Sequence, residues 1–286
     1  MKPEGDRIVR VGHFSQRRFD DNLNPAGGKF QGWNCLKILL TNDDGLDSPS
    51  LQALSVRLSR EHEVWVVAPD GDRSGSSHSI TLKEPIVIYR KGKRIFACNG
   101  TPVDCVILGV LKLARDNVDA VISGPNLGYN LGTDLLYSGT AAAARQGVLM
   151  GIPALAASLA SREYGDDMKP AVEFLARNLA AFHGLASSDH FLNINFPSRL
   201  PQNLRACITF PSLRIYRDDI ITVDERTDRM ACTIGGDIPE SHLSPGSDGE
   251  AIASGCISIS PIYVHPVNHK IEERYRSVSL WTGWEK

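Results

Sequence analysis

Hydrophobic and polar positions alternate between two kinds of segment along most of the chain. Short apolar runs, such as LKILLT at 36–41 and EVWVVAP at 63–69, are typical of buried strands. Between them, SPSLQALSVRLSR at 48–60 has apolar residues at helical spacing, with Ser48 placed to cap the helix and Pro49 at its first position. Strands that alternate with helices in this way predict a mostly parallel sheet covered by helices on both faces.

The same alternation continues to about residue 200. We predict a hairpin over 84–100 that turns near 91–93, helices over 102–115, 141–149 and 168–183, and strands over 118–124, 153–158 and 190–196. Thr101 and Asp104 resemble a capping box for the helix over 102–115.

Beyond residue 200 the pattern changes to extended segments. Strands are predicted over 205–210, 214–224, 229–235 and 251–262, with the polar stretch 224–229 as the tip of a hairpin. Two interpretations of this hairpin stay open, because it could reach a partner subunit or simply extend the sheet.

Residues 1–34 differ in composition from the rest. They are rich in Arg, Asp, Asn and Gly and show no sustained periodicity, which predicts a disordered extension. A transit peptide is an alternative that the arginines suggest, but the segment also carries acids, which transit peptides avoid. We expect residues 35–286 to form a single α/β domain, with 200–286 a β-rich part used in oligomerisation.

Composition narrows the class of protein. A net charge of −2 argues against binding to a nucleic acid polymer or an anionic membrane. No apolar run reaches the roughly 20 residues of a membrane-spanning helix, and no secretory signal is recognisable. The six cysteines are dispersed without a C-x-x-C pair, so we expect reduced thiols and a cytoplasmic protein.

Three of the predicted strands end in polar segments. The first ends in TNDDG at 41–45, the second in APDGDRSGSSHSIT at 68–81, and the third in SGPNLGYNLGTDLLYSGT at 123–140. Ligands of open parallel sheets bind beyond the carboxyl ends of the strands. We therefore expect these three segments to face one another and to form the functional site.

The adjacent carboxylates Asp43 and Asp44 can be interpreted in two ways. N-D-D-G is a common turn sequence, and taken alone a turn is the better interpretation. At the mouth of a sheet, however, two carboxylates repel each other unless a cation or hydrogen bonds compensate. Ser74 and Asn126 could complete a set of oxygen ligands, which favours Mg²⁺ or Mn²⁺ over Zn²⁺.

A second feature is the sequence Ser138-Gly139-Thr140, which precedes a predicted helix. Its N–H groups and hydroxyls could bind an anion at the helix N-terminus. A simple N-cap by Ser or Thr needs no ligand and is the commoner arrangement. Beside a divalent cation, the combination suggests a phosphate held between cation and helix.

The serine-rich segment at 68–81 also has two interpretations. It is either a flexible surface loop or a lid that contacts phosphate. His78 within it could act as an acid, a base or a hydrogen-bond donor.

Other enzyme classes lack support, because the chain has no Walker loop, no G-x-G-x-x-G after the first strand and no G-x-S-x-G elbow.

Taken together, ILLTNDDG, VVAPDGDRSGSSHSIT, CNGTPVDCV, ISGPNLGYNLG and YSGTAAAARQGVLMGIPALAAS resemble the SurE (survival protein E) family of metal-dependent 5′/3′-nucleotidases. The resemblance runs from about Leu36 to about Ile262. It implies a Rossmann-like three-layer α/β/α fold, one Mg²⁺ or Mn²⁺ per subunit, and cytoplasmic homodimers or homotetramers that exchange C-terminal elements. Gln146 and Ala141 depart from the glutamate and valine common in the family.

The resemblance also implies roles for particular residues. Asp43, Asp44, Ser74 and Asn126 would bind the metal, while Asn42 and the Ser138-Gly139-Thr140 turn would contact phosphate. The implied reaction is hydrolysis of nucleoside monophosphates by metal-assisted attack of water, with Asp43 and Asp44 as the catalytic pair. Whether water or a carboxylate is the nucleophile stays open. So does activity on 3′-nucleotides or polyphosphate.

Two rival interpretations remain at this point. One is an acid phosphatase or exopolyphosphatase of broad specificity, and the other is a nucleotide-binding module without catalysis. Tyr129 and Tyr137 lie near the predicted site and could stack on a base, although packing in the core or a lid would explain them equally well.

Overall fold

A computed structural model describes residues 35–115, 117–160, 168–198, 205–237 and 239–265. The predicted extension over 1–34 and the last part of the predicted β-rich region lie outside the described residues.

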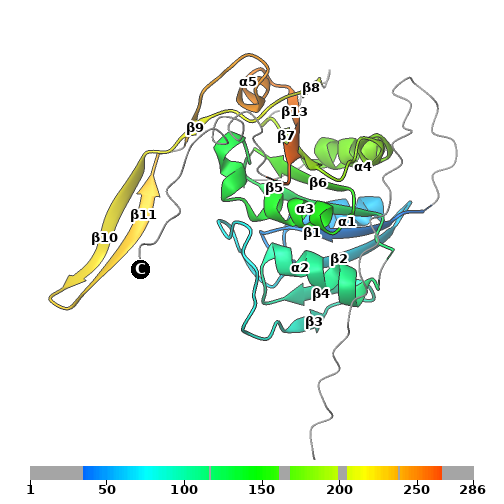
Figure 1. Cartoon of the computed structure of the whole chain (residues 1–286), viewed down its shortest axis with the longest axis horizontal. Coiled ribbons are helices and arrows are strands. Elements are labelled where there is room, and N and C mark those ends of the chain that lie inside the picture. Colours follow the sequence, from blue (N-terminus) through cyan, green and yellow to red (C-terminus); the bar gives the residue numbers. More distant parts are fainter. Residues whose placement is uncertain (1–34, 116, 161–167, 199–204, 238, 266–286) are drawn as a thin grey trace, which may run out of the picture.

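A large mixed sheet forms the centre of the fold (Figure 1). Among the described residues it has nine strands, in the spatial order β3 (Ile88–Arg90), β4 (Ile95–Cys98), β2 (Glu63–Pro69), β1 (Lys37–Thr41), β5 (Ala120–Leu127), β6 (Ala154–Leu159), β7 (His190–Phe196), β13 (Ile257–Tyr263) and β8 (Ala206–Ile208). The run from β4 to β7 is parallel, whereas β3 and β13 pair antiparallel with their neighbours β4 and β7. The predicted α/β class is confirmed.

Helices cover both faces of the sheet, as predicted. One face carries α1 (Pro49–Leu58) and α4 (Met168–Gly184), and the other carries α2 (Pro102–Leu108), the π-helical turn η1 (Gly109–Leu113) and α3 (Gly139–Leu149). Successive strand residues point to opposite faces. Ile38 and Leu40 of β1 therefore join the core under α1 and α4, while Leu39 packs under α2.

Two details of the predicted helices were wrong. The helix expected over 102–115 changes at Gly109 into the π-helical turn, in which Ala114 N–H donates to Gly109 O over five residues. Its predicted capping box, with Thr101 and Asp104, is confirmed. Ser48 does not cap α1 with its side chain, because its hydroxyl bonds to the Ser50 hydroxyl instead, although Pro49 does begin the helix.

The C-terminal part also differs from the prediction. The strand expected over 251–262 is wrong in its first half, where α5 (Asp248–Ala253) forms because Ser247 caps it by accepting from Glu250 N–H. The strand expected over 214–224 is broken into β9 (Arg214–Ile215) and β10 (Asp218–Arg226). The pattern of exposed apolar residues contains no signal for that break.

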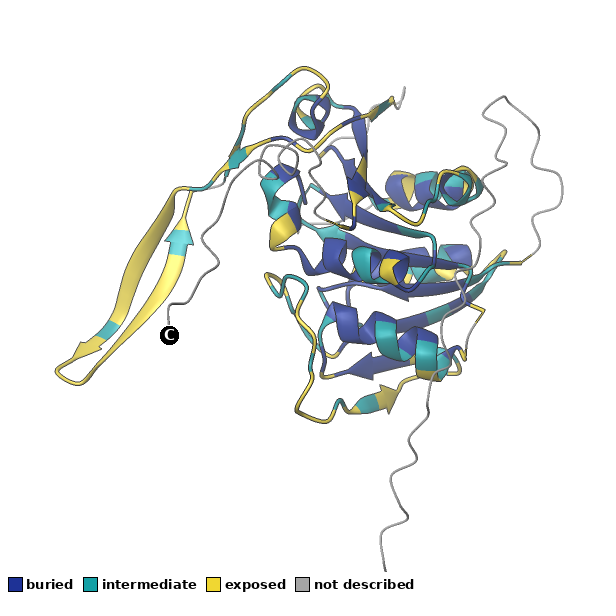
Figure 2. Ribbon diagram, in the orientation of Figure 1, coloured by how far each residue is buried: buried dark blue, intermediate teal, exposed yellow. Residues whose placement is uncertain are grey.

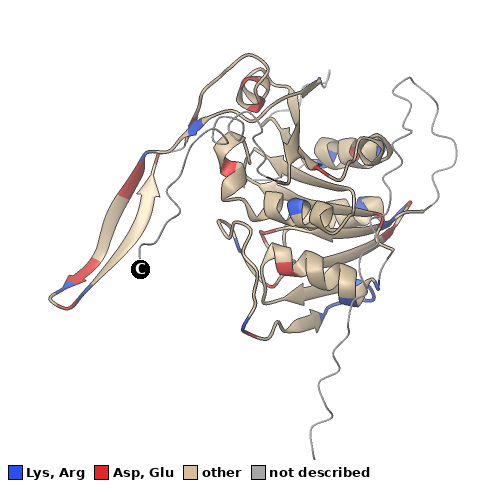
Figure 3. Ribbon diagram, in the orientation of Figure 1, with Lys and Arg blue, Asp and Glu red and all other residues tan. Residues whose placement is uncertain are grey.

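A long hairpin extends from the body of the molecule (Figure 1). It consists of β10 and β11 (Arg229–Gly236), and the short pair β9 and β12 (Glu240–Ser241) lies at its base. Its residues are largely exposed (Figure 2). Acidic residues stand near the base and near the tip of β10, with apolar residues between them (Figure 3).

Candidate active site

Three loops meet at the carboxyl edge of the sheet. β1 lies between β2 and β5 and is parallel to both, so the first loop (42–48), the second loop (70–87) and the third loop (128–138) begin at the same edge. Arg73 N–H donates to Asp43 O at 2.8 Å, and Ser77 N–H donates to Tyr137 O at 3.0 Å. The predicted meeting of the three segments is confirmed.

Asp43 is buried at the N-terminus of α3. Its carboxylate accepts from Thr140 N–H at 3.1 Å and from the Thr140 hydroxyl. Burial raises the pKa of Asp43 above its usual value, although the Thr140 hydrogen bonds act in the opposite direction. The positive end of the helix therefore faces an internal carboxylate, which the sequence had not indicated.

Asp44 points to a different element from its neighbour. It is half-buried, and its carboxylate accepts from Leu127 N–H, at the end of β5, at 3.1 Å. The adjacent Asn126 donates from its amide to Gly128 O at 2.9 Å. The two carboxylates are thus aimed separately, one by α3 and the other by the strand that carries Asn126.

Gly45 turns the chain directly after this pair. Its φ of +99° lies in the region that favours glycine, and a Cβ there would come within 3.1 Å of the Gly71 backbone. Leu46 N–H also donates to Pro69 O at 2.9 Å, so the first two loops are packed together. The turn predicted from N-D-D-G is present, directly after the two carboxylates.

Ser74 is exposed in the second loop. Its N–H and its hydroxyl both bond to the Asp72 carboxylate, at 2.8 and 2.5 Å. The negative charge of Asp72 also contributes to the raised pKa of Asp43, so this turn lies beside the buried carboxylate. Asp72 is a residue that the sequence analysis missed, because a carboxylate in a polar loop carries no distinguishing pattern.

Two buried oxygens near Asp43 lack a hydrogen-bond partner within the described residues. They are Asn42 Oδ1 and Ser76 Oγ. The Asn42 amide donates to Gly45 O at 2.9 Å, which holds this side chain inside the first turn. A Cβ built on Gly139 would lie 2.8 Å from Ser76 Oγ and 3.1 Å from Asp43 Oδ2, so both atoms border the start of α3. Buried polar atoms normally have partners, and such exceptions point to a ligand or ion.

Ser138 forms the simple cap that was the alternative to an anion site. Its hydroxyl accepts from Ala141 N–H at 3.0 Å. With Thr140 donating to Asp43, the hydroxyls of this turn already have partners inside the protein. Their predicted contact with phosphate stays a prediction.

Comparison with known proteins fits this arrangement. The family model described as Survival protein SurE matches residues 38–218. The chain belongs to the SurE family. The resemblance indicated by the sequence motifs is therefore confirmed, and all the candidate site residues lie within the matched range.

Individual relatives of this SurE chain match it over most of its length. It is 40% identical over 253 residues to the 5′-nucleotidase SurE of Citrifermentans bemidjiense, which covers 87% of this chain and 99% of that protein. It is 39% identical over 254 residues to the 5′-nucleotidase SurE of Geobacter sulfurreducens, covering 87% and 94% respectively. The crystal structure of the SurE protein from Aquifex aeolicus superposes with a TM-score of 0.73 at 31% identity, covering 84% of this chain and 98% of that chain.

His78 of this SurE site contacts α3 beyond the helix start that holds Asp43. Its Nε2 is 3.1 Å from Oε1 of Gln146, which is six residues, or about 9 Å, along α3 from Thr140. Its Nδ1 is buried and has no partner in the described part of the chain. Burial lowers the pKa of His78, and the charge of Arg145 lowers it further. His78 therefore fastens the second loop to α3, a contact that the sequence analysis missed.

This environment predicts a dependence of stability on pH. Because the folded state favours neutral His78, this residue's contribution to the free energy of unfolding is fully present above the ordinary histidine pKa of about 6.5. That contribution is lost as the pH falls through the lower pKa that His78 has in the folded state. We expect the melting temperature to fall between pH 7 and pH 5, and to fall less in His78→Asn. Thermal scans across this range would test it, with exposed His242→Asn as the control. An equal slope in wild type and His78→Asn would contradict it.

The two tyrosines proposed for base stacking differ in accessibility. Tyr129 is half-buried and bonds to Ser198, and burial raises its pKa. Tyr137 is 56% exposed and packs edge-on against Tyr216, with ring centroids 5.7 Å apart. Of the two, Tyr137 keeps an accessible ring near the start of α3.

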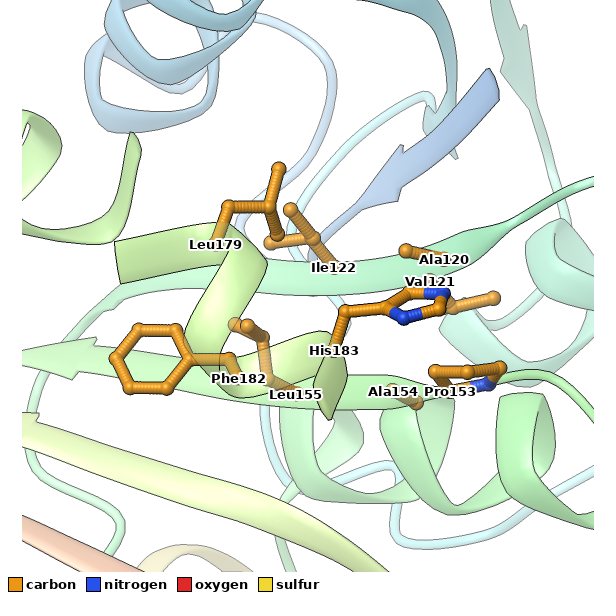
Figure 4. Close-up of a pocket in the computed structure, with 9 residues that line it drawn as sticks. All are labelled: Ala120, Val121, Ile122, Pro153, Ala154, Leu155, Leu179, Phe182 and His183. Carbon is orange, nitrogen blue, oxygen red and sulfur yellow. The ribbon is translucent and has the colours of Figure 1, made fainter. Parts of the chain in front are cut away.

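A small apolar pocket lies elsewhere in this SurE fold (Figure 4). It is lined by residues that include Val121, Pro153, Leu179 and His183. Ala120 and Ala154, which begin β5 and β6, also line it, so it lies at the opposite edge of the sheet from the carboxylates. Across the described ranges, no helix is long and apolar enough to cross a membrane.

Proposed function

We propose that this chain hydrolyses nucleoside 5′-monophosphates to nucleoside and phosphate, with a divalent cation bound at the carboxyl edge of the sheet. The observation that carries the proposal is the buried Asp43 carboxylate, which lies at the N-terminus of α3 beside Asp44. The 5′-nucleotidase names of relatives 40% identical to this chain support the substrate class.

The residues present fit a hard cation. Asp43, Asp44, Ser74 and Asn126 supply carboxylate, hydroxyl and amide oxygens, the ligand types that Mg²⁺ and Mn²⁺ prefer. Within the described residues there is no group of three or more His, Cys, Asp or Glu side chains that could hold a metal ion, so hydroxyl and amide oxygens would have to complete the set. The unpartnered Asn42 Oδ1 beside them is consistent with a ligand at this place. We propose one Mg²⁺ or Mn²⁺ per subunit.

When bound, such a cation polarises phosphate oxygens and lowers the pKa of a coordinated water. The chain's own residues provide the geometry. Thr140 orients Asp43 through two hydrogen bonds, and Leu127 N–H orients Asp44. The start of α3, with Ser138, Gly139 and Thr140, and the Asn42 side chain would face the phosphate, where the helix dipole favours negative charge.

The nucleophile in this proposal is water, oriented by Asp43 or Asp44. Attack by a carboxylate is the alternative, and it would leave a covalent phosphoenzyme. Trapping such an intermediate by rapid quench would exclude direct attack by water.

A substrate and metal panel tests the activity. We expect phosphate release from AMP and GMP that requires Mg²⁺ or Mn²⁺ and stops on addition of EDTA, with less release from p-nitrophenyl phosphate. Equal rates on all monoesters would indicate a phosphatase of broad specificity, and 3′-AMP and polyphosphate in the same panel would measure the other proposed activities. Nucleotide binding without phosphate release would indicate a binding module.

The hairpin supports a homo-oligomer, which we propose to be a dimer or tetramer with exchanged C-terminal elements. Ile220 and Ile234 face each other across β10 and β11 and are 66% and 74% exposed. Exposed apolar residues in one patch mark interaction sites. The reduced thiols and the family favour the cytoplasm as its location.

Charging this pair should disrupt the assembly. We expect the double variant Ile220→Asp with Ile234→Asp to be a monomer in light scattering after size exclusion, because the buried charges would be unpaired at the interface. Thr233→Asp, an exposed polar position of the same hairpin, is the matched control and should keep the wild-type mass. A wild-type chain that is already monomeric would contradict the proposed oligomer.

A further inference from the structure

Two cysteines that belong to none of the proposed ligand or phosphate-binding positions lie close together beneath the second loop. Cys98 ends β4 and Cys105 belongs to α2, and their sulfurs are 3.2 Å apart. Both side chains are fully buried and both are free thiols. No step of the proposed hydrolysis uses them.

We propose that Cys98 and Cys105 are a modification site, at which a hydroperoxide oxidises the two thiols to an intramolecular disulfide that a thiol reductant reopens. A disulfide bond is about 2 Å long, so the sulfurs need to approach by only about 1 Å. The two residues are seven positions apart on the adjoining elements β4 and α2. Disulfides in reducing compartments are typically transient and respond to redox conditions.

The two thiols have different chemical roles. The hydrogen bond from the Cys105 thiol lowers the pKa of Cys98, whereas burial raises the pKa of Cys105. The Cys98 thiolate attacks one peroxide oxygen and forms a sulfenic acid, and the leaving hydroxide takes up a proton to become water. The Cys105 sulfur then attacks the Cys98 sulfur and releases a second water. Two thiols are oxidised by two electrons, and the O–O bond is reduced.

The position of Cys98 gives a small oxidant a route to it. Cys98 pairs with Ile88 of β3, the three-residue strand at the edge of the sheet. Tyr89 and Arg90 of this strand are exposed. Short edge strands open locally at little cost, and hydrogen peroxide is close to water in size. Opening of β3 would expose the edge of β4 at Cys98 without unfolding the sheet.

The pair also lies next to two points at which the second loop is held. Asp70 N–H donates to Cys98 O at 2.7 Å, and the Thr81 hydroxyl donates to Asp104, next to Cys105, at 2.7 Å. A bond between Cys98 and Cys105 would therefore join the two elements that hold this loop.

Mass spectrometry of the full chain tests the proposal directly. Trypsin cuts after Arg94 and Lys112, so a single peptide, 95–112, contains both cysteines. After treatment with hydrogen peroxide and alkylation of the remaining thiols, we expect this peptide to carry no alkyl group. Its mass should be two hydrogens lower than that of the reduced peptide before alkylation. Dithiothreitol before alkylation should restore both labels. The readout does not depend on nucleotidase activity.

The other cysteines provide controls. Cys35 and Cys232 are exposed, and Cys207 lies beside Cys256, so these positions show whether oxidation is selective. Cys98→Ser should leave Cys105 fully alkylated, and Cys207→Ser should leave the disulfide in 95–112 unchanged. The proposal is overturned if peptide 95–112 keeps both labels while other cysteines oxidise. It is overturned equally if Cys98 proceeds to sulfinic acid or pairs with another residue. Peptide mapping of the wild-type chain tests the proposal by itself, even if a variant fails to fold.

Discussion

Asp43→Asn should abolish metal-dependent phosphate release, with a loss of at least about 100-fold. Asparagine has the same shape and can still accept the N–H of Thr140, so the start of α3 keeps its position. It lacks the negative charge that would hold a cation. Asp44→Asn should have the same effect, because the Leu127 N–H that orients this side chain can donate to an amide oxygen as well.

Melting temperatures of these variants distinguish loss of the metal site from loss of the fold. Asp43 is 3% exposed, and a buried charge without its cation is costly, so Asp43→Asn should melt in EDTA no lower than wild type. Mn²⁺ should raise the melting temperature of wild type and leave that of Asp43→Asn unchanged. If both variants hydrolyse AMP at the wild-type rate, the assignment of the site is wrong.

Gly139→Ala should lower kcat by about 100-fold while the protein stays folded. The new methyl group would lie 2.8 Å from Ser76 Oγ, closer than real contacts allow, and 3.0 Å from Asp43 Cβ, so both neighbours would have to shift. Because Thr140, the next residue of α3, also bonds to the Asp43 carboxylate, Asp43 must shift together with the helix start. Alanine is otherwise the better helix residue, so the helix itself is not weakened.

A matched glycine supplies the control for this steric effect. Gly92 lies at the turn between β3 and β4. In Gly92→Ala the added Cβ would lie 3.4 Å from the Ile95 side chain, an ordinary van der Waals distance. We expect it to leave AMP hydrolysis unchanged. Full activity in Gly139→Ala would show that the start of α3 does not border the reacting groups. Circular dichroism and thermal scans of both variants would show that each is folded.

Local sequence signals predicted the central part of the fold well. The buried strands were recognisable because continuous apolar runs are required where a parallel sheet is covered on both faces, as at Leu39 and Leu40. Thr101 and Asp104 identified a helix start because capping bonds form within a few residues. α5 was missed, since Ala251 to Ala253, which end this short helix, are apolar and precede the apolar strand β13 by only three residues.

The candidate site was predictable in part for the same reason. Asp43 and Asp44 were found because parallel strands place their carboxyl ends at one edge, which follows from the order of elements alone. The sequence alone therefore determined the α/β class, the family and the segments that meet. Whether each candidate residue binds metal or phosphate stays a prediction.

Only the tertiary structure decided which atoms touch. Thr140 holds Asp43 across 97 positions of sequence, and His78 meets Gln146 across 68. The proximity of Cys98 to Cys105 likewise depends on how α2 packs against the end of β4. Such contacts depend on the packing of separate elements, to which many distant residues contribute, so no local pattern encodes them. The order and spacing of elements in the sequence indicated which loops would meet. The packing of those elements determined which side chains contact one another within the loops.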